Sequence, residues 1–492
     1  MSILRPQNEP VKWLDFIYLR DALDAAGCPI CTLVERACYR QLDNLFYENV
    51  SDVGVRLRLY KSKGFCNAHA WMATRIPHTD SGIAIIYGDL LRSVIERTEA
   101  QVRQLAAAGS PRRLHRSRRR GRSASVLETT APCPVCETAR FNERVYFGEL
   151  LKWFDDPELR TAFQRSFGLC LPHLDLAMRG FPDHPHLPEL LATEREKLTG
   201  LQTELKEFSR KRDDRLANEP KDTDQAARRR AIELFVGKRE VFHRDRPRRT
   251  KRSALNLVFP REPPASKWLP LYRLRDALDA DCCVICALIE RESERQMTLL
   301  FHEGIMDPGV RLALRRSGGF CNSHGWLAAR TPTAPAGLAV VYEELLATVI
   351  ERSAAVTEPT KPRAKRRASD APLLYPATAN CPMCDWNSST EYLTLSNLLD
   401  FFDDPDFASK YHDSFGICLP HLQMALDESP DHPQLQRLLG AERGRLAALQ
   451  TELQEFDRKR DYRHANEPKG VEQTSWRRVI EKFVGHREMI GR

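Results

Sequence analysis

The sequence has no hydrophobic run long enough to cross a membrane. A spanning helix needs about 18 apolar residues in a row, and the most apolar stretch, residues 82–91, is interrupted by Asp89. The opening residues, MSILRPQNEPVKW, contain no apolar core typical of a secretory signal. The sequence therefore excludes a membrane protein, a secreted mini-protein and a collagen-like chain, and we expect a cytoplasmic protein.

Common catalytic motifs are also missing. We find no Ser/His/Asp arrangement, no Walker loop, no dinucleotide-binding glycine fingerprint and no HExxH motif. Their absence does not exclude an enzyme, but it favours a non-enzymatic role. With 492 residues, of which 42% are hydrophobic and 29% charged, the chain is long enough for two or more globular domains.

The excess positive charge is confined to three short segments, although the whole chain carries a formal charge of +8. Residues 111–123, 244–252 and 361–367 together carry +17, so the rest of the chain is mildly acidic. Their composition, rich in Pro, Arg and Ser, is typical of linkers. They could tether nucleic acid or another polyanion. They contain no Phe, Tyr or Trp, however, which favours soluble spacers because single-strand binding usually uses aromatic stacking.

The chain is a tandem duplication. Residues 14–71 align with residues 269–326 at an offset of 255, and after the first basic segment the offset becomes 248. Each half contains two related modules, and so regular a period is typical of a repeat architecture. The predicted order is module A (1–107), a linker (108–130) and module B (131–240), then a linker (241–265), module A (266–357), a linker (358–378) and module B (379–492).

Each module carries a Cys-x-x-Cys pair, then an Asp, and then a Cys-x-x-His pair fourteen residues after that Asp. A Cys-x-x-Cys pair lets two sulfurs converge on one ion. Three thiolates with one imidazole form a standard four-coordinate structural zinc set. The ligand sets predicted within the modules are Cys28, Cys31, Cys66 and His69; Cys133, Cys136, Cys170 and His173; Cys283, Cys286, Cys321 and His324; and Cys381, Cys384, Cys418 and His421.

Other interpretations of these cysteines stay open. A [4Fe–4S] cluster usually takes four cysteines, but one histidine in their place is chemically plausible. Cysteine pairs at a helix start also favour thiol–disulfide chemistry, because their pKa is lowered, although a dithiol centre needs no fourth ligand. Buried cysteines without any ion are the plainest alternative. The spacing also leaves open whether ligands are shared between modules. Two cysteines, Cys38 and Cys282, belong to no module set.

The segments between the motifs predict helices, and strand signals are few, so we predict an all-α fold built from repeated metal-binding units. Residues 13–26 and 31–48 are candidate helices, separated at Gly27. Apolar residues at helical spacing in 198–208 and 446–456 indicate core-facing helices, with a coiled-coil seam as the alternative. Asp-Pro pairs at 156–157, 307–308 and 404–405 predict helix N-caps.

Two further features occur once in each half. Trp71 follows His69 by two residues and Trp326 follows His324 in the same way, and we expect both to pack over the metal site. A basic stretch at 208–215 and 456–463 is followed by Asn-Glu-Pro. It could bind an anion or a partner, but a solvated helix end with internal ion pairs is the simpler interpretation.

The motifs resemble those of an uncharacterised bacterial family of unknown function. The resemblance rests on Cys-Pro-Ile-Cys (28–31), Gly-Phe-Cys-Asn-Ala-His-Ala-Trp (64–71), Gly-Leu-Cys-Leu-Pro-His (168–173) and the tail at 458–468. It covers nearly the whole chain as two tandem copies. The sequence departs from the pattern at Val284, where the other modules have Pro, and at Asp214, where the second copy has Tyr462. The resemblance implies a bacterial cytoplasmic origin and no particular activity.

We therefore predict a metal-binding helical repeat protein that acts as an interaction or scaffold protein for an unidentified protein partner. Zinc is the expected metal. The alternatives are an iron–sulfur electron-transfer or sensor protein, and a nucleic-acid-binding protein that uses the basic linkers.

Overall fold

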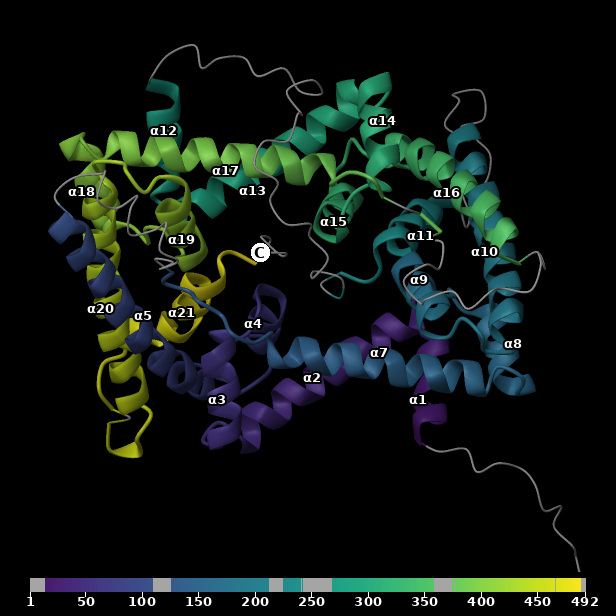
Figure 1. Ribbon diagram of the computed structural model, residues 1–492, viewed down its shortest axis with the longest axis horizontal. Coiled ribbons are helices and arrows are strands. Elements are labelled where there is room, and N and C mark those ends of the chain that lie inside the picture. Colours follow the sequence, from purple (N-terminus) through teal and green to yellow (C-terminus); the bar gives the residue numbers. More distant parts are fainter. Residues whose placement is uncertain are drawn as a thin grey trace, which may run out of the picture. The chain divides into compact units, whose positions relative to one another are not determined.

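The computed structural model describes residues 14–108, 125–211, 224–239, 241, 268–357, 374–375, 377–464 and 466–487. Within these ranges the chain forms helices and no strand, which confirms the predicted all-α fold (Figure 1). No helix in the described ranges is long and apolar enough to cross a bilayer. The three basic segments predicted to be linkers or polyanion tethers all fall outside the described residues.

The helices of the first half include those predicted around residues 13–26, 31–48 and 198–208. They are α1 (Leu14–Leu23), α2 (Pro29–Glu48), α3 (Val53–Ser62), α4 (Asn67–Ala73), α5 (Asp80–Ala108), α7 (Pro134–Lys152), α8 (Pro157–Arg165), α9 (Leu171–Gly180), α10 (Leu187–Arg210) and α11 (Asp224–Val236).

The second half repeats this order. Its helices are α12 (Trp268–Ala277), α13 (Val284–Leu299) with a π-helical turn (Leu300–Gly304), α14 (Pro308–Ser317), α15 (Asn322–Arg330), α16 (Pro335–Thr357), α17 (Pro382–Phe401), α18 (Pro405–Asp413), α19 (Leu419–Glu428), α20 (Leu435–Arg458) and α21 (Ser475–Val484), with 3₁₀ turns at Tyr462–His464 and Val471–Thr474.

The Asp of every module caps the short helix that precedes the Cys-x-x-His pair. The carboxylate of Asp52 accepts from the Val55 N–H at 2.7 Å, and Asp156, Asp307 and Asp404 cap α8, α14 and α18 in the same way. Two residues before the next Cys a glycine reverses the chain; Gly64, with φ of 88°, adopts a conformation that a side chain would disfavour. The cap and the glycine thus aim each Cys at the start of the next helix.

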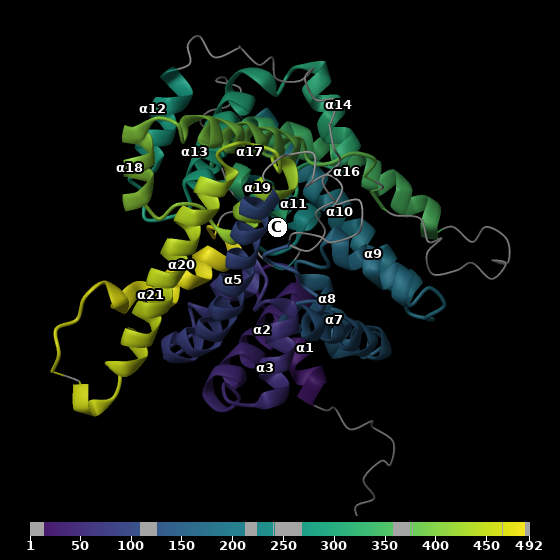
Figure 2. The same ribbon diagram turned by 60° about the vertical axis from the view of Figure 1, so that its left-hand side comes forward.

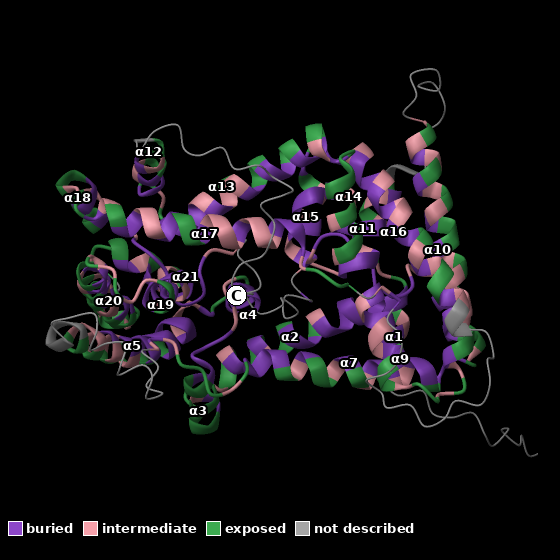
Figure 3. Ribbon diagram, turned by 45° about the horizontal axis from the view of Figure 1, so that its top comes forward, coloured by how far each residue is buried: buried purple, intermediate pink, exposed green. Residues whose placement is uncertain are grey.

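The described residues divide between two compact units, and each unit takes helices from both halves of the sequence. Unit 1 falls within Met1–Ala37, Ala139–Phe242 and Phe301–Cys381. Here α10 of the first half packs along α16 of the second, and α11 packs against α9, α15 and α16 (Figure 1). The apolar residues of α10 at 198–208 are buried, which confirms the predicted core-facing stripe (Figure 3).

Unit 2 falls within Cys38–Thr138, His243–Leu300 and Pro382–Arg492. Here α20 of the second half packs along α5 of the first (Figure 2), and α21 packs against α4, α5 and α19. Helix α13 packs against α12 and α17. Each compact unit combines parts of several predicted modules. The module boundaries given above therefore stay a prediction from the sequence.

Candidate metal centres

The sixteen predicted ligands lie in four groups of four, and in each group one potential ligand atom per residue lies within 4.8 Å of the others. We number these groups as clusters. Cluster 1 is Cys28, Cys31, Cys170 and His173; cluster 2 is Cys66, His69, Cys133 and Cys136; cluster 3 is Cys283, Cys286, Cys418 and His421; and cluster 4 is Cys321, His324, Cys381 and Cys384.

The predicted grouping of the ligands within single modules is wrong. In the first half, the Cys-x-x-Cys pair of module A meets the Cys-x-x-His pair of module B in cluster 1, and the two remaining pairs meet in cluster 2. The second half repeats this exchange in clusters 3 and 4. Spacing along the chain could not reveal the exchange, because either pairing brings a Cys-x-x-Cys to a Cys-x-x-His.

Helix starts hold the ligands in place. Cys66, Cys170, Cys321 and Cys418 are the N-cap residues of α4, α9, α15 and α19, and none of their side chains makes a capping hydrogen bond. Their sulfurs are therefore directed to the clusters instead. The Cys-x-x-Cys pairs likewise open α2, α7, α13 and α17. As a result, the partial positive charge of two helix N-termini faces the sulfurs of each cluster.

The ligand atoms of clusters 1 and 2 lie at hydrogen-bond distances from one another. In cluster 1, His173 Nδ1 lies 3.4 Å from both Cys28 Sγ and Cys31 Sγ, and 3.3 Å from Cys170 Sγ. In cluster 2, His69 Nδ1 lies 3.2, 3.6 and 3.4 Å from the sulfurs of Cys66, Cys133 and Cys136. The histidines therefore turn the same ring nitrogen, Nδ1, towards the sulfurs.

Clusters 3 and 4 follow the same geometry. His421 Nδ1 lies 3.2 Å from Cys283 Sγ, 3.7 Å from Cys286 Sγ and 3.0 Å from Cys418 Sγ. In cluster 4, His324 Nδ1 lies 3.2 Å from Cys321 Sγ and 3.6 Å from Cys381 Sγ. All members of clusters 1 and 3 are buried, whereas Cys66 in cluster 2 and two cysteines of cluster 4 are half-buried.

The environment of cluster 1 shifts the pKa values of its members in different directions. Burial opposes ionisation of Cys28, but hydrogen bonds from Cys170 and Cys31 and the charge of His173 hold the Cys28 pKa well below its usual value. Burial raises the pKa of Cys31 to about 11. Burial lowers the pKa of His173, but the neighbouring thiolates outweigh that effect and raise it overall. The ion-free cluster therefore stabilises the thiolate of one cysteine, Cys28, and thiolate is the form of cysteine that binds metal.

The sequence comparisons agree with the repeat pattern. A profile described as "Family of unknown function (DUF6062)" matches residues 12–241 and again residues 269–489. The chain belongs to this family. Its two matches confirm the predicted tandem copies of an uncharacterised domain.

One relative of this chain is the "Uncharacterized 23.9 kDa protein in xynA 3′region" of Caldicellulosiruptor sp. (strain Rt8B.4). It is 26% identical over 187 residues, which are 38% of this chain and 82% of the relative. No solved structure matches this chain.

Each DUF6062 copy also supplies a buried carboxylate to one of its histidines, a feature that the sequence prediction missed. Glu391 Oε1 lies 3.1 Å from His421 Nε2, and Glu143 Oε1 lies 3.9 Å from His173 Nε2. A carboxylate at the second ring nitrogen fixes the tautomer and orientation of a metal-binding His. The available signal was a Glu seven residues after the second Cys of each module B, where module A has Cys38 or Ser293.

A Val-Gly turn after the last helix of each DUF6062 copy lies against the cysteines. We call residues 236–238 turn 1 and residues 484–486 turn 2. The backbone N–H of Lys238 in turn 1 donates to Cys31 Sγ at 3.5 Å. In turn 2, a Cβ on Gly485 would lie 3.4 Å from Cys286 Sγ and 3.5 Å from Cys418 Sγ. The repeated Phe-Val-Gly sequence was visible in each copy, but its contact with clusters 1 and 3 was not.

The two repeated tryptophans make a contact that the sequence did not predict. The indole N–H of Trp71 donates to the Gly485 carbonyl at 3.0 Å, and that of Trp326 donates to the Gly237 carbonyl at 3.1 Å. Each Trp therefore binds the Val-Gly turn of the other DUF6062 copy.

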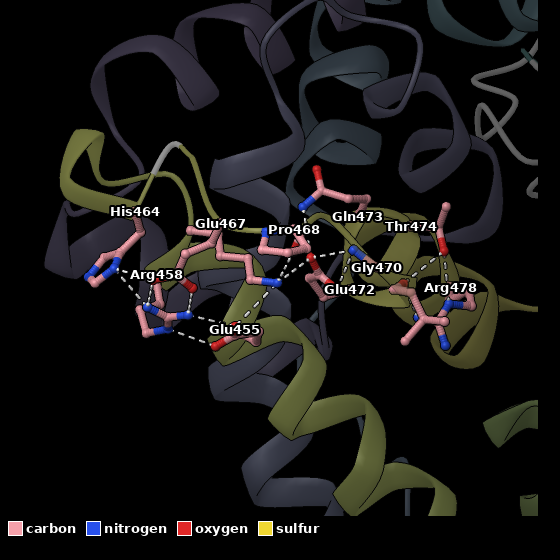
Figure 4. A network of polar contacts seen from close by, with 12 residues as sticks. Glu455, Arg458, His464, Glu467, Pro468, Gly470, Glu472, Gln473, Thr474 and Arg478 are labelled. Atoms are coloured by element: carbon pink, nitrogen blue, oxygen red, sulfur yellow. Dashed lines mark hydrogen bonds and ion pairs between the residues drawn. The ribbon is translucent and has the colours of Figure 1, made fainter.

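The basic tail of the second copy is an internally paired network, as the simpler interpretation predicted. Arg458 forms ion pairs with Glu455 and Glu467 and also contacts His464, while Lys459 donates to the Pro468 carbonyl and the Glu472 carboxylate (Figure 4). Because these charges are matched locally, the network provides little net charge for an anionic ligand. The equivalent stretch of the first copy lies largely outside the described residues.

Proposed function

We propose that this DUF6062 protein is a non-enzymatic interaction protein whose helices are held together by four structural zinc ions, one in each cluster. The observation that carries this proposal is the spacing of the ligand atoms within the clusters. That spacing suits one ion surrounded by three sulfurs and one nitrogen.

The spacing can be compared with an ideal tetrahedral site. With Zn–S bonds of about 2.3 Å and Zn–N bonds of about 2.05 Å, two sulfurs lie about 3.8 Å apart and a sulfur lies about 3.6 Å from the nitrogen. One sulfur–sulfur distance in each of clusters 1, 2 and 3 is 3.7, 3.6 and 3.9 Å, respectively. The sulfur–Nδ1 distances are 3.0 to 3.7 Å. A [4Fe–4S] cluster places several iron and sulfide atoms between its ligands and needs more room, so the spacing supports a single ion.

Charge and burial support a structural role for this ion. Zn²⁺ with three thiolates carries a net charge of −1, which the two helix N-termini at each cluster offset. Four protein ligands fill a tetrahedral shell and leave no open position for a substrate, as in structural zinc sites. Such sites contribute on the order of 10 kcal/mol of apparent folding free energy. The ions would then serve to hold a helical surface that binds a protein partner.

The test is elemental analysis and a visible absorption spectrum of protein purified without oxygen. We expect about four zinc ions per chain and no visible absorption band. Several iron and sulfide ions per chain with broad visible absorption would replace the zinc proposal with a redox one. The absence of both metals, with thiols that readily form disulfides, would indicate dithiol chemistry.

Binding of nucleic acid through the basic linkers remains a separate prediction from the sequence. Its test is the salt dependence of binding, since several phosphate contacts give a steep loss of affinity as salt rises. Deletion of residues 111–123 should then abolish binding; binding that survives the deletion would assign these residues a spacer role.

A further inference from the structure

The two halves of the chain bind each other through the same contacts made twice, once in each unit. In unit 1, α11 and turn 1 of the first half dock on α15 and α16 of the second. In unit 2, α21 and turn 2 of the second half dock on α4 and α5 of the first. We infer that each DUF6062 copy carries an interaction surface for a second copy of the same repeat, and that this chain is such a dimer fused into one polypeptide.

A buried asparagine forms the centre of each docking contact. The Asn67 side-chain amide donates to the carbonyls of Val484 at 2.7 Å and His486 at 3.1 Å. In unit 1, Asn322 donates to the carbonyls of Val236 at 2.7 Å and of Lys238 at 3.0 Å. Both asparagines are less than 10% exposed, so their loss would leave buried carbonyl groups of the turn without a partner.

Asn67 and Asn322 also connect the docking contact to the metal centres. Asn67 directly follows the Cys of the Cys-x-x-His pair in cluster 2, and Asn322 directly follows the Cys of the pair in cluster 4. The turns that they bind lie against clusters 3 and 1, as described above. Each turn of one copy is therefore held between a cluster of its own copy and the cluster-bearing helix of the other copy.

Aromatic contacts repeat the same pattern on either side of the turn. Phe483 packs edge-on against Tyr87 with ring centroids 5.1 Å apart, and Phe235 packs against Tyr342 at the same distance. Both tyrosines are fully buried. A guanidinium also stacks on each tryptophan of the receiving helix: Arg477 lies 5.7 Å from the Trp71 ring, and Arg229 lies 5.6 Å from the Trp326 ring.

Polar contacts between the long helices extend the docking surface. Gln202 and Lys206 of α10 approach the same carboxylate of α16, that of Glu343, at 3.3 and 3.7 Å. In unit 2, Arg460 beyond the end of α20 donates to Asp80 at the start of α5. The two copies are thus joined along whole helices as well as through the turns.

The loops before each module B exchange a backbone contact as well. The Leu374 N–H donates to Asp175 at 2.9 Å in unit 1, and the Val126 N–H donates to Gln423 at 2.7 Å in unit 2. Leu374 and Val126 are equivalent positions in the two copies, as are Gln423 and Asp175. The whole set of contacts is therefore reciprocal, as expected for an interface between two copies of one repeat.

A single copy on its own would leave both the turn and its receiving helices uncovered. The Caldicellulosiruptor relative has about the length of one copy, because its 187 aligned residues make up 82% of it. A chain of that length can complete the fold described here only by pairing with a second chain. The partner that fits this surface is another DUF6062 repeat.

The test cuts the full chain between its halves after folding. A site for a specific protease is inserted within residues 244–262, outside the described residues, and the folded protein is cleaved. We expect denaturing gels to show two fragments. Native mass spectrometry should show one particle with the mass of the uncut chain, which is 56.4 kDa plus the mass of the inserted site. Zinc content and helical circular dichroism are measured on the same sample.

A second measurement tests the contacts themselves. Cleaved protein is mixed with an isotope-labelled cleaved sample, and the exchange of halves is followed by native mass spectrometry. We expect Asn67→Ala with Asn322→Ala to accelerate exchange at least 10-fold, since each substitution removes one buried and one part-buried hydrogen bond to the turn. The matched control is Asn49→Ala, whose side chain donates to the Asn44 carbonyl within one half.

Two results would overturn the inference. One is cleaved halves that separate into two particles while keeping their helix content and metal. The other is an exchange rate in the double variant equal to that of the Asn49→Ala control. Trp326→Phe, which keeps the ring and removes only the N–H donor to Gly237, gives a milder variant if the double variant does not fold. Metal content decides the proposed function separately, because the halves are expected to remain together whichever ion is bound.

Discussion

The crossed pairing of ligands can be tested by counting ions in cysteine variants. Cys28 and Cys170 come from different modules but belong to cluster 1, whereas Cys28 and Cys66 come from one module but belong to different clusters. We therefore expect Cys28→Ser with Cys170→Ser to lose one ion, and Cys28→Ser with Cys66→Ser to lose two. Ligand sets confined to single modules predict the reverse.

The size of the effect follows from the ligand count. A structural zinc site is worth about 10–16 kcal/mol of apparent binding free energy, so losing one of four ligands costs on the order of 3 kcal/mol, or about 100-fold in affinity. A chelator of suitable affinity then removes the ion from the altered cluster and leaves the others occupied.

The assay is native mass spectrometry or elemental analysis after chelator treatment. Cys38→Ser serves as the control, because Cys38 is buried but belongs to no cluster, and it should retain four ions. A Cys28→Ser and Cys66→Ser protein that lost only one ion would refute the crossed assignment.

Three further predictions follow from the groups around the clusters. At neutral pH, ion-free cluster 1 holds two thiols and a histidine whose pKa values are raised. Metal binding should therefore release about three protons per ion, and the affinity for the metal should fall up to 1,000-fold for each unit that the pH falls. Calorimetry in buffers of different ionisation enthalpy measures the number of protons released. Burial raises the pKa of Asp175 to about 6, so the folded state is favoured while this carboxyl is protonated, and that part of the folding free energy is lost as pH rises through 6. Asp175→Asn should therefore raise the free energy of unfolding, measured in urea, by on the order of 1–2 kcal/mol at pH 8 and not at pH 4. Glu391→Gln should weaken metal binding at cluster 3 by about 10- to 100-fold. Glu143→Gln should cause a smaller loss of affinity at cluster 1, because the Glu143 carboxylate lies 3.9 Å from His173. Equal losses for the two variants in competition titrations would contradict the geometry.

Local features of the fold could be predicted because neighbouring residues determine them. Asp156 caps α8 through its own side chain, and the Pro at 157 fits the first helical position, so the sequence is sufficient to predict this helix start. The same holds for the cysteines that open helices, since the motif and the helix start coincide.

Contacts between distant segments could not be predicted in this way. Cys31 and Cys170 share a cluster across 139 positions, and nothing near either residue distinguishes this pairing from the one with Cys66. Glu143 lies two turns along a helix that begins with ligands of another cluster, so its role depends on the tertiary fold. The expected packing of Trp71 over a metal site came from local spacing, which did not indicate that its donor group binds a turn 414 positions away.

The reach of the Asn67 contact also affects how the chain is made. Asn67 and Val484 are 417 positions apart. At a synthesis rate of about 5–20 residues per second, roughly 20–80 s pass between the appearance of these two residues. During that interval the nascent first half has its own cysteine pairs but lacks the element that covers α4 and α5. A chain terminated early would keep those buried surfaces exposed, which makes truncated products natural targets for chaperones and proteases.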